Sequence, residues 1–176
     1  MKNGKTVILR PLRWEDLESV LELANKLVGE RDEDPNLGII FDQKQTRESE
    51  SDWLANLLRD VELGRQLNVA AEVDGEIVGN SHVARGRSSD EKHHGVLGIS
   101  ILKRYRNLGI GSEIMKALLE EARKSKFRSL ELEVFANNGR AIHLYEKLGF
   151  REVGRIPKKI KRGNRFIDSL IMYKKL

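Results

Sequence analysis

The stretch RNLGIGS, residues 106–112, joins a predicted strand over His94–Leu102 to a predicted helix over Ser112–Lys124. Its two glycines let the backbone come close to a ligand, and the start of a helix offers unpaired N–H groups and the positive end of the helix dipole. The side chains of Lys103, Arg104 and Arg106 add positive charge where a polyphosphate would approach. These features predict a loop that binds phosphate groups.

Two well-known phosphate loops do not fit this stretch. A Walker loop ends in Gly-Lys-Ser or Gly-Lys-Thr, whereas Gly111 is followed directly by Ser112 and Glu113. A dinucleotide fingerprint needs a third glycine where this chain has Ile114. The spacing that remains is Arg-x-x-Gly-x-Gly, which on its own also fits a plain helix start with two glycines.

A second motif follows at residues 132–150, with the pattern LxVxxxNxxAxxLYxKLGF. Together with the Arg-x-x-Gly-x-Gly spacing before it, this pattern resembles the two motifs of the Gcn5-related N-acetyltransferase (GNAT) superfamily. Residues 97–101 also resemble the bulged fourth strand of that family. The resemblance runs from about residue 6 to the end and is closest over residues 93–150.

The resemblance implies an α/β (α+β) fold with a mixed, mostly antiparallel sheet of six to seven strands, about four flanking helices, and fourth and fifth strands that splay apart. It also implies a single domain over residues 1–176 with a CoA-binding core at about 93–150. Periodicity and turn residues independently predict the elements. The strands are 6–10, 68–73, 76–85, 94–102, 129–135, 151–156 and 165–173; the helices are 17–28 (ending at Gly29), 46–61, 112–124 and 141–148; residues 31–45 form a loop.

Acetyl-CoA is the cofactor that the resemblance implies, as acyl donor, and no metal is expected. The backbone of Ile99 and Ile101 would pair with the pantetheine arm, Asn138 would hydrogen-bond to it, and Tyr145 would stand near the thioester sulfur and protonate the leaving thiolate. The acceptor amine would attack acetyl-CoA directly in a ternary complex. The pyrophosphate would be bound by backbone N–H groups of Arg106, Asn107, Leu108, Gly109, Ile110, Gly111 and Ser112.

Two of these residues also have a purely structural interpretation. Tyr145 lies on the apolar face of its predicted helix, together with Ala141 and Leu148, so it could simply be a core aromatic residue. Asn138 could be the N-cap of that helix, a role compatible with contacting CoA.

The general base is left open by the sequence. Many relatives have a glutamate in the fourth strand where this chain has Val96. The first candidates are therefore His94 and His93, because the unperturbed pKa of histidine suits proton transfer near neutral pH. Deprotonation by bulk water competes with both. Three further residues could face the cleft, namely Glu72, His82 and Glu133.

Composition bounds the remaining questions. The chain has 176 residues, a net charge of +5 and no cysteine, which excludes disulfides, thiolate metal sites and a cysteine nucleophile. We expect a cytoplasmic protein, because no stretch predicts a secretory signal or a membrane span. The family resemblance is compatible with a homodimer.

The positive charge is concentrated in one segment. Residues 151–176 hold nine Lys or Arg against two acidic residues, net +7, which leaves net −2 for the rest of the chain. Because the last hairpin of this fold usually helps to select the acceptor, we expect a small amine or a peptide N-terminus that is neutral or anionic overall, and not a polyamine. Two other classes are weighed: a non-catalytic CoA-binding module, disfavoured by the intact Tyr145, and a nucleic-acid-binding protein, disfavoured by the absence of aromatic-studded basic strands.

Overall fold

One seven-stranded sheet organises the computed structural model, which describes residues 6–34, 37–39 and 42–176. The strand order is β1-β2-β3-β4-β5-β7-β6. The strands are β1 Ile8–Arg10, β2 Gln66–Val73, β3 Glu76–Arg85, β4 His94–Ile101, β5 Ser129–Phe135, β6 Arg151–Arg162 and β7 Arg165–Lys175. The helices are α1 Leu17–Glu33, α2 Arg47–Glu62, α3 Ile110–Lys124 and α4 Gly139–Lys147.

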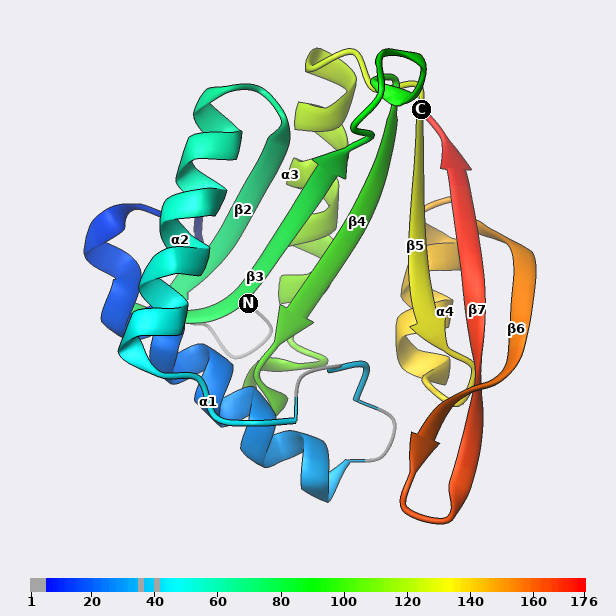
Figure 1. The fold of residues 1–176 in the computed structure, drawn as a ribbon, viewed down its shortest axis with the longest axis horizontal. Coiled ribbons are helices and arrows are strands. Elements are labelled where there is room, and N and C mark those ends of the chain that lie inside the picture. Colours follow the sequence, from blue (N-terminus) through cyan, green and yellow to red (C-terminus); the bar gives the residue numbers. More distant parts are fainter. Residues whose placement is uncertain (1–5, 35–36, 40–41) are drawn as a thin grey trace.

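The helices cover both faces of this sheet (Figure 1). α1 and α2 lie over one face, and α3 and α4 lie behind the other. The apolar stripe of α3 is fully buried, with Ile114, Leu118 and Ala122 each 0% exposed, because it packs against β2 and β3. All strand pairs are antiparallel except β4 with β5, whose parallel pairing follows from the crossover through α3. The expected mixed sheet with four helices is confirmed.

β4 and β5 separate halfway along their length. Their parallel pairing begins at His94 with Ser129 and ends at Leu97 with Leu132. Beyond that point β4 remains paired with β3, up to Ile101 with Gly79, while β5 remains paired with β7. The two strands visibly diverge toward the lower end in Figure 1. The expected splay is therefore present, and it leaves the inner edge of residues 98–101 without a strand partner among the described residues.

The glycines of β4 mark close contacts and not the bulge that the resemblance implies. The register with β3 is continuous from Gly95 to Ile101, without a shift. A Cβ atom at Gly98 would lie 2.6 Å from His82 Cε1, and one at Gly95 would lie 2.4 Å from Val83 Cγ1. At both positions neighbouring side chains occupy the space that a Cβ atom would need.

Several element boundaries differ from the sequence prediction, most of them by one or two residues. α1 continues past Gly29 to Glu33, because Glu30 anchors the extra turn by accepting hydrogen bonds from Lys103 N at 2.7 and 2.9 Å. Within the expected loop 31–45, residues 35–36 and 40–41 lie outside the described residues. β6 extends to Arg162 through Pro157, which is tolerated because β6 is an edge strand and its pairing with β7 is irregular between Ile156 and Ile160. α3 begins at Ile110, two residues early.

Candidate active site

The loop before α3 presents a row of unused backbone N–H groups. Asn107 and Gly109 have φ angles of +62° and +93°, and such left-handed residues next to ordinary ones turn successive N–H groups toward one concave side. From Asn107 to Gly111 no N–H has an acceptor among the described residues. The N–H groups of Arg106 and Ser112, by contrast, donate to Lys103 O at 3.2 Å and to Gly109 O at 3.0 Å. Five of the seven expected donors therefore remain available for an anion.

The basic side chains beside this loop are engaged elsewhere, which corrects the expectation that they add free positive charge there. Lys103 Nζ lies 3.0 Å from a Glu33 carboxylate oxygen, and Arg104 pairs with Glu76. Arg106 pairs with Glu30 in α1, and its Nε donates to Ile101 O at 2.8 Å. Both partners of the Arg106 pair are mostly buried, with 20% and 16% of their side chains exposed. Arg106 thus fastens the end of β4 to α1.

The start of α3, the end of β4 and α4 meet at one point. A Cβ atom at Gly111 would lie 3.2 Å from Ile101 Cδ1 and 3.4 Å from Leu144 Cδ2. A Cβ atom at this position would contact both side chains more tightly than is usual. The structure therefore brings together the N–H loop, the open edge of β4 that carries Ile99 and Ile101, and the helix that carries Tyr145.

Asn138 caps α4, as its structural interpretation predicts. Its side-chain oxygen accepts a hydrogen bond from Ala141 N at 3.2 Å. Its side-chain amide nitrogen donates to no residue in the described part of the chain. The cap fixes the side chain and leaves one polar group able to contact a ligand.

Tyr145 combines a core ring with an unused hydroxyl. The residue is 7% exposed, and its ring makes an edge contact with Phe150 at a centroid distance of 6.0 Å. Burial raises the pKa of the phenol to about 12, so Tyr145 is protonated at neutral pH. Its hydroxyl has no hydrogen-bond partner among residues 6–34, 37–39 and 42–176. The hydroxyl is not among the fully enclosed polar atoms of the described residues, so a ligand atom can reach it.

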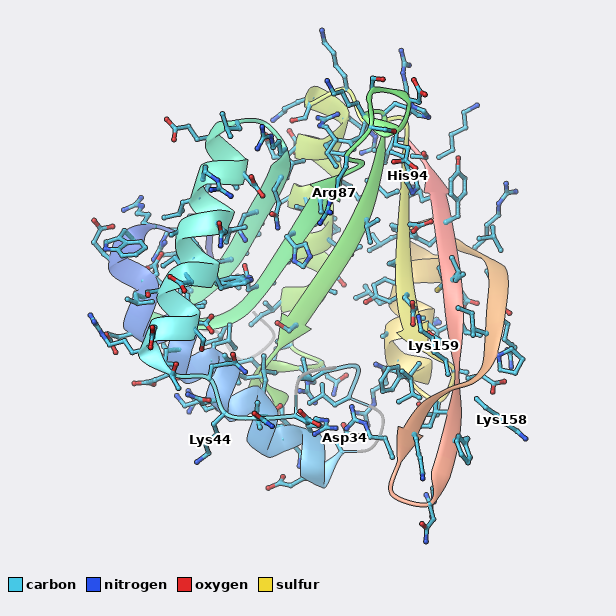
Figure 2. The ribbon with its side chains drawn as sticks, viewed as in Figure 1. Asp34, Lys44, Arg87, His94, Lys158 and Lys159 are labelled. Carbon is cyan, nitrogen blue, oxygen red and sulfur yellow. The ribbon has the colours of Figure 1, made fainter. Side chains whose placement is uncertain are left out.

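His93 and His94 are not brought to this site. His94 lies at the paired end of β4, labelled in Figure 2, where its Nδ1 is 2.9 Å from Ser129 Oγ and its Nε2 is 3.4 Å from a Glu131 carboxylate oxygen. Five residues of strand, about 16 Å, separate it from Ile99. His93 is an exposed turn residue just before β4. Their proximity in sequence to the fourth strand places them at its beginning, whereas the splay lies at its end.

Two of the remaining base candidates also serve other partners. Glu72 accepts a hydrogen bond from Arg10 Nε at 2.7 Å on the far side of β3. Glu133 binds Lys159 Nζ at 2.6 Å (Lys159 is labelled in Figure 2). Burial opposes ionisation of Glu133, yet hydrogen bonds from Lys159 and Ser169 hold the pKa of this carboxyl below its usual value.

A cavity of about 370 Å³ lies on the α1–α2 side of the sheet and reaches the splayed part of β4. His82 lines it, and burial lowers the pKa of this imidazole, which is therefore neutral at neutral pH. Of the five base candidates, His82 alone lines this cavity among the described residues. The lining residues are Val20, Leu23, Ala24, Leu27, Gly38, Ile39, Gln45, Glu50, Trp53, Asn80, His82, Gly98, Ile99 and Ser100.

Glu50 is a site residue that the sequence prediction missed. It is 6% exposed, and burial raises the pKa of its carboxyl to about 7. Its side chain has neither a hydrogen bond nor an ion pair with any described residue. The available signal was its spacing, because Glu50 stands four and seven positions before Leu54 and Leu57 and so occupies the buried stripe of α2.

Comparisons with known proteins agree with this geometry. A family model described as "Acetyltransferase (GNAT) family" matches residues 24–150. The chain is 30% identical to an N-alpha-acetyltransferase of Sulfurisphaera tokodaii over 163 residues, 86% of this chain and 84% of that one. A ribosomal-protein-alanine N-acetyltransferase from Brucella melitensis superposes with a TM-score of 0.83 at 27% identity, over 96% and 99% of the two chains. A putative acetyltransferase from Salmonella typhimurium, solved with its cofactor acetyl-CoA, superposes with a TM-score of 0.81 at 18% identity, over 96% and 93%.

Proposed function

The chain belongs to the acetyltransferase (GNAT) family, and we propose that it transfers an acetyl group from acetyl-CoA to a primary amine of a small molecule or a peptide N-terminus. The observation that carries this proposal is the convergence of three features: the free N–H groups of residues 107–111, the unpaired edge of β4, and the unpartnered Tyr145 hydroxyl. Residues 93–150 would form the CoA-binding core.

The N–H loop fits the pyrophosphate of CoA. Five N–H donors and the positive end of the α3 dipole favour a doubly negative group without any lysine or arginine side chain. This matters here because the adjacent cations are held in ion pairs with Glu30, Glu33 and Glu76. The pantetheine arm would then run along the open edge of β4 past Ile101 and Ile99, and Asn138 would donate from its free amide.

The chemistry that we propose is a direct attack on the thioester. The neutral amine forms a bond to the acetyl carbon, the carbon–sulfur bond breaks, and an N–H of β4 donates to the oxygen that becomes negative. A preorganised donor of this kind contributes about 3 kcal/mol to barrier lowering in comparable sites. Tyr145, protonated because its pKa is raised to about 12, donates to the leaving thiolate and recovers the proton from the reacting nitrogen.

The acceptor would enter from the α1–α2 side, through the cavity that reaches Gly98–Ser100. The last hairpin is less positive than its composition implies, since Lys159 is paired with Glu133 of β5, outside this segment. A small amine or a peptide N-terminus that is neutral or anionic apart from the reacting amine, and not a polyamine, remains our proposal. The names of the relatives, an N-alpha-acetyltransferase and a ribosomal-protein-alanine N-acetyltransferase, support an α-amino group as acceptor.

A non-catalytic CoA-binding module is the alternative, and Tyr145 separates the two functions. Tyr145→Phe removes only the hydroxyl, so we expect turnover to fall on the order of a hundredfold while the dissociation constant of CoA, measured by calorimetry, stays unchanged. Tyr173→Phe, in β7, is the matched control and should leave both unchanged. Equal turnover for the two variants would contradict an acid role for Tyr145.

A further inference from the structure

Glu50 occupies a position where the packing of α2 calls for an apolar residue. It stands in line with Leu54 and Leu57, which are 0% and 3% exposed, and a leucine there would extend the stripe. An ionised carboxylate without a partner is costly to bury. The first turn of α2 also carries Glu48, which is exposed and interacts with the helix dipole from the solvent side. The dipole therefore gives no reason for a second carboxylate that faces inward.

The residues that line the cavity beside Glu50 suit a ligand that carries an apolar group next to a polar atom. One wall consists of apolar α1 residues, Val20, Leu23, Ala24 and Leu27. Another wall consists of Gly98, Ile99 and Ser100, the part of β4 that has separated from β5. Glu50 and His82 are the titratable groups among the described residues of the lining: α1 contributes none, and the α1–α2 connection contributes Gly38, Ile39 and Gln45.

We infer that Glu50 binds the ammonium group of the acceptor and takes up its proton, and that the α1 wall holds an apolar side chain carried beside that amine. This inference rests on the proposed acetyl transfer at the same site. The preferred acceptors are thus primary amines of amino-acid size with a medium-sized apolar side chain, presented either free in amide form or at a peptide N-terminus.

The proton balance of this step is complete without a further reactant. Glu50 takes one proton from the ammonium and returns it to water after product leaves. The neutral nitrogen then forms the bond to the acetyl carbon while the carbon–sulfur bond breaks. The second nitrogen proton ends on the CoA sulfur by way of Tyr145. Glu50 is suited to the first transfer because it lines the cavity and because a carboxyl with a pKa of about 7 is a competent base that is about half ionised at neutral pH.

The size of the cavity supports an acceptor of this class. A volume of about 370 Å³ is at the lower end of the range for ligand pockets, which fits one residue and the acetyl end of the donor. A charged side chain against the α1 wall would lose its hydration without gaining a partner among the described lining residues. The pocket therefore selects by exclusion as well as by contact.

The test compares acceptors and variants in one assay. Wild-type protein should acetylate L-leucinamide with a kcat/KM at least about tenfold above that of glycinamide, because the leucine side chain is buried on α1. L-lysinamide should be poorer than L-leucinamide. Glu50→Gln should lower kcat/KM for L-leucinamide on the order of a hundredfold and remove the acidic limb of its pH profile near pH 7, with acetyl-CoA affinity unchanged. Glu48→Gln, in the same helix turn, is the matched control.

A second variant and a binding measurement separate the possible failures. His82→Gln should keep the acidic limb; loss of the limb in this variant, with its retention in Glu50→Gln, would overturn the inference. Equal kcat/KM for Glu50→Gln and Glu48→Gln would overturn it as well. Calorimetry of L-leucinamide with the CoA-loaded protein should show weaker binding to Glu50→Gln. If binding depends on Glu50 but no amine is acetylated, the acceptor pocket stands and the proposed transfer fails.

Discussion

Leu97 of β4 pairs with Leu132 of β5, and beyond this pair the two strands go separate ways although both continue for several residues. β4 keeps its pairing with β3, and β5 keeps its pairing with β7. Each strand therefore loses pairing only along the edge that faces the other. An unpaired strand edge inside a sheet is otherwise avoided. An extended ligand that pairs with this edge would remove the liability, so the break in the sheet is suited to bind one.

Acetyl-CoA should protect two separate segments from hydrogen exchange. The inner edge of residues 98–101 and the N–H groups of residues 107–111 lack acceptors in the described structure, so their amides should exchange rapidly in the free protein. Saturating CoA should slow both segments together. β2, which is paired on both sides, serves as internal control. Protection of residues 107–111 from exchange, without protection of residues 98–101, would contradict the proposed path of the pantetheine arm.

Gly109→Ala should weaken CoA binding more than it weakens the fold. Nothing lies within 4 Å of a Cβ atom at this position, but the φ of +93° costs a side chain about 1–2 kcal/mol and would shift the N–H groups of the loop. Gly29→Ala in α1 is the matched control, with equally open space and helical backbone, and should add about 0.5–1 kcal/mol of stability. Urea unfolding and calorimetry give the two quantities. Unchanged CoA affinity in Gly109→Ala would argue against the N–H loop as the pyrophosphate site.

Glu50 should make the stability of the protein fall as pH rises through neutrality. Burial raises the pKa of its carboxyl from 4.5 to about 7, so the folded state holds this proton more tightly than the unfolded state does. The loss of folding stability caused by ionising Glu50 is absent below pH 4.5 and grows between pH 4.5 and 7. It is complete above pH 7, where it amounts to about 3 kcal/mol. Glu50→Leu should therefore be more stable than wild type at pH 8, and this gain in stability should be much smaller at pH 5.

The measurement is the free energy of urea unfolding at the two pH values. Glu48→Leu removes an exposed carboxylate from the same helix turn and should show little difference between them. If the gain in the free energy of unfolding from Glu50→Leu were the same at pH 5 and pH 8, Glu50 would not have the raised pKa of a buried carboxyl without a partner.

Local patterns predicted the fold and the turns and caps that shape the candidate donor site. The turn at Asp74 and Gly75, both with positive φ, and the cap of α4 at Asn138 follow from residues adjacent in sequence. The loop of residues 106–112 was predictable for the same reason, since its conformation is set by its own glycines and by the helix that it opens.

The acceptor side depended on contacts between distant residues, and here sequence reasoning was less successful. His94 was one of the first candidates for the base because it belongs to the fourth strand, yet that strand places it about 16 Å from Ile99. Arg106 appeared free to meet a phosphate, but it pairs with Glu30, 76 residues away. Glu50 was overlooked because only the packing of α2 against α1 and the sheet turns it toward a cavity.

Acetyl transfer by the wild-type protein tests the central proposal most directly. Purified protein is incubated with acetyl-CoA and L-leucinamide, and free thiol and N-acetylated product are measured together over time. The structure predicts thiol release that requires the amine and matches the acetylated product molecule for molecule. Tight binding of acetyl-CoA without thiol release, for this amine and for a panel of peptide N-termini, would contradict the account and leave a CoA-binding module in its place.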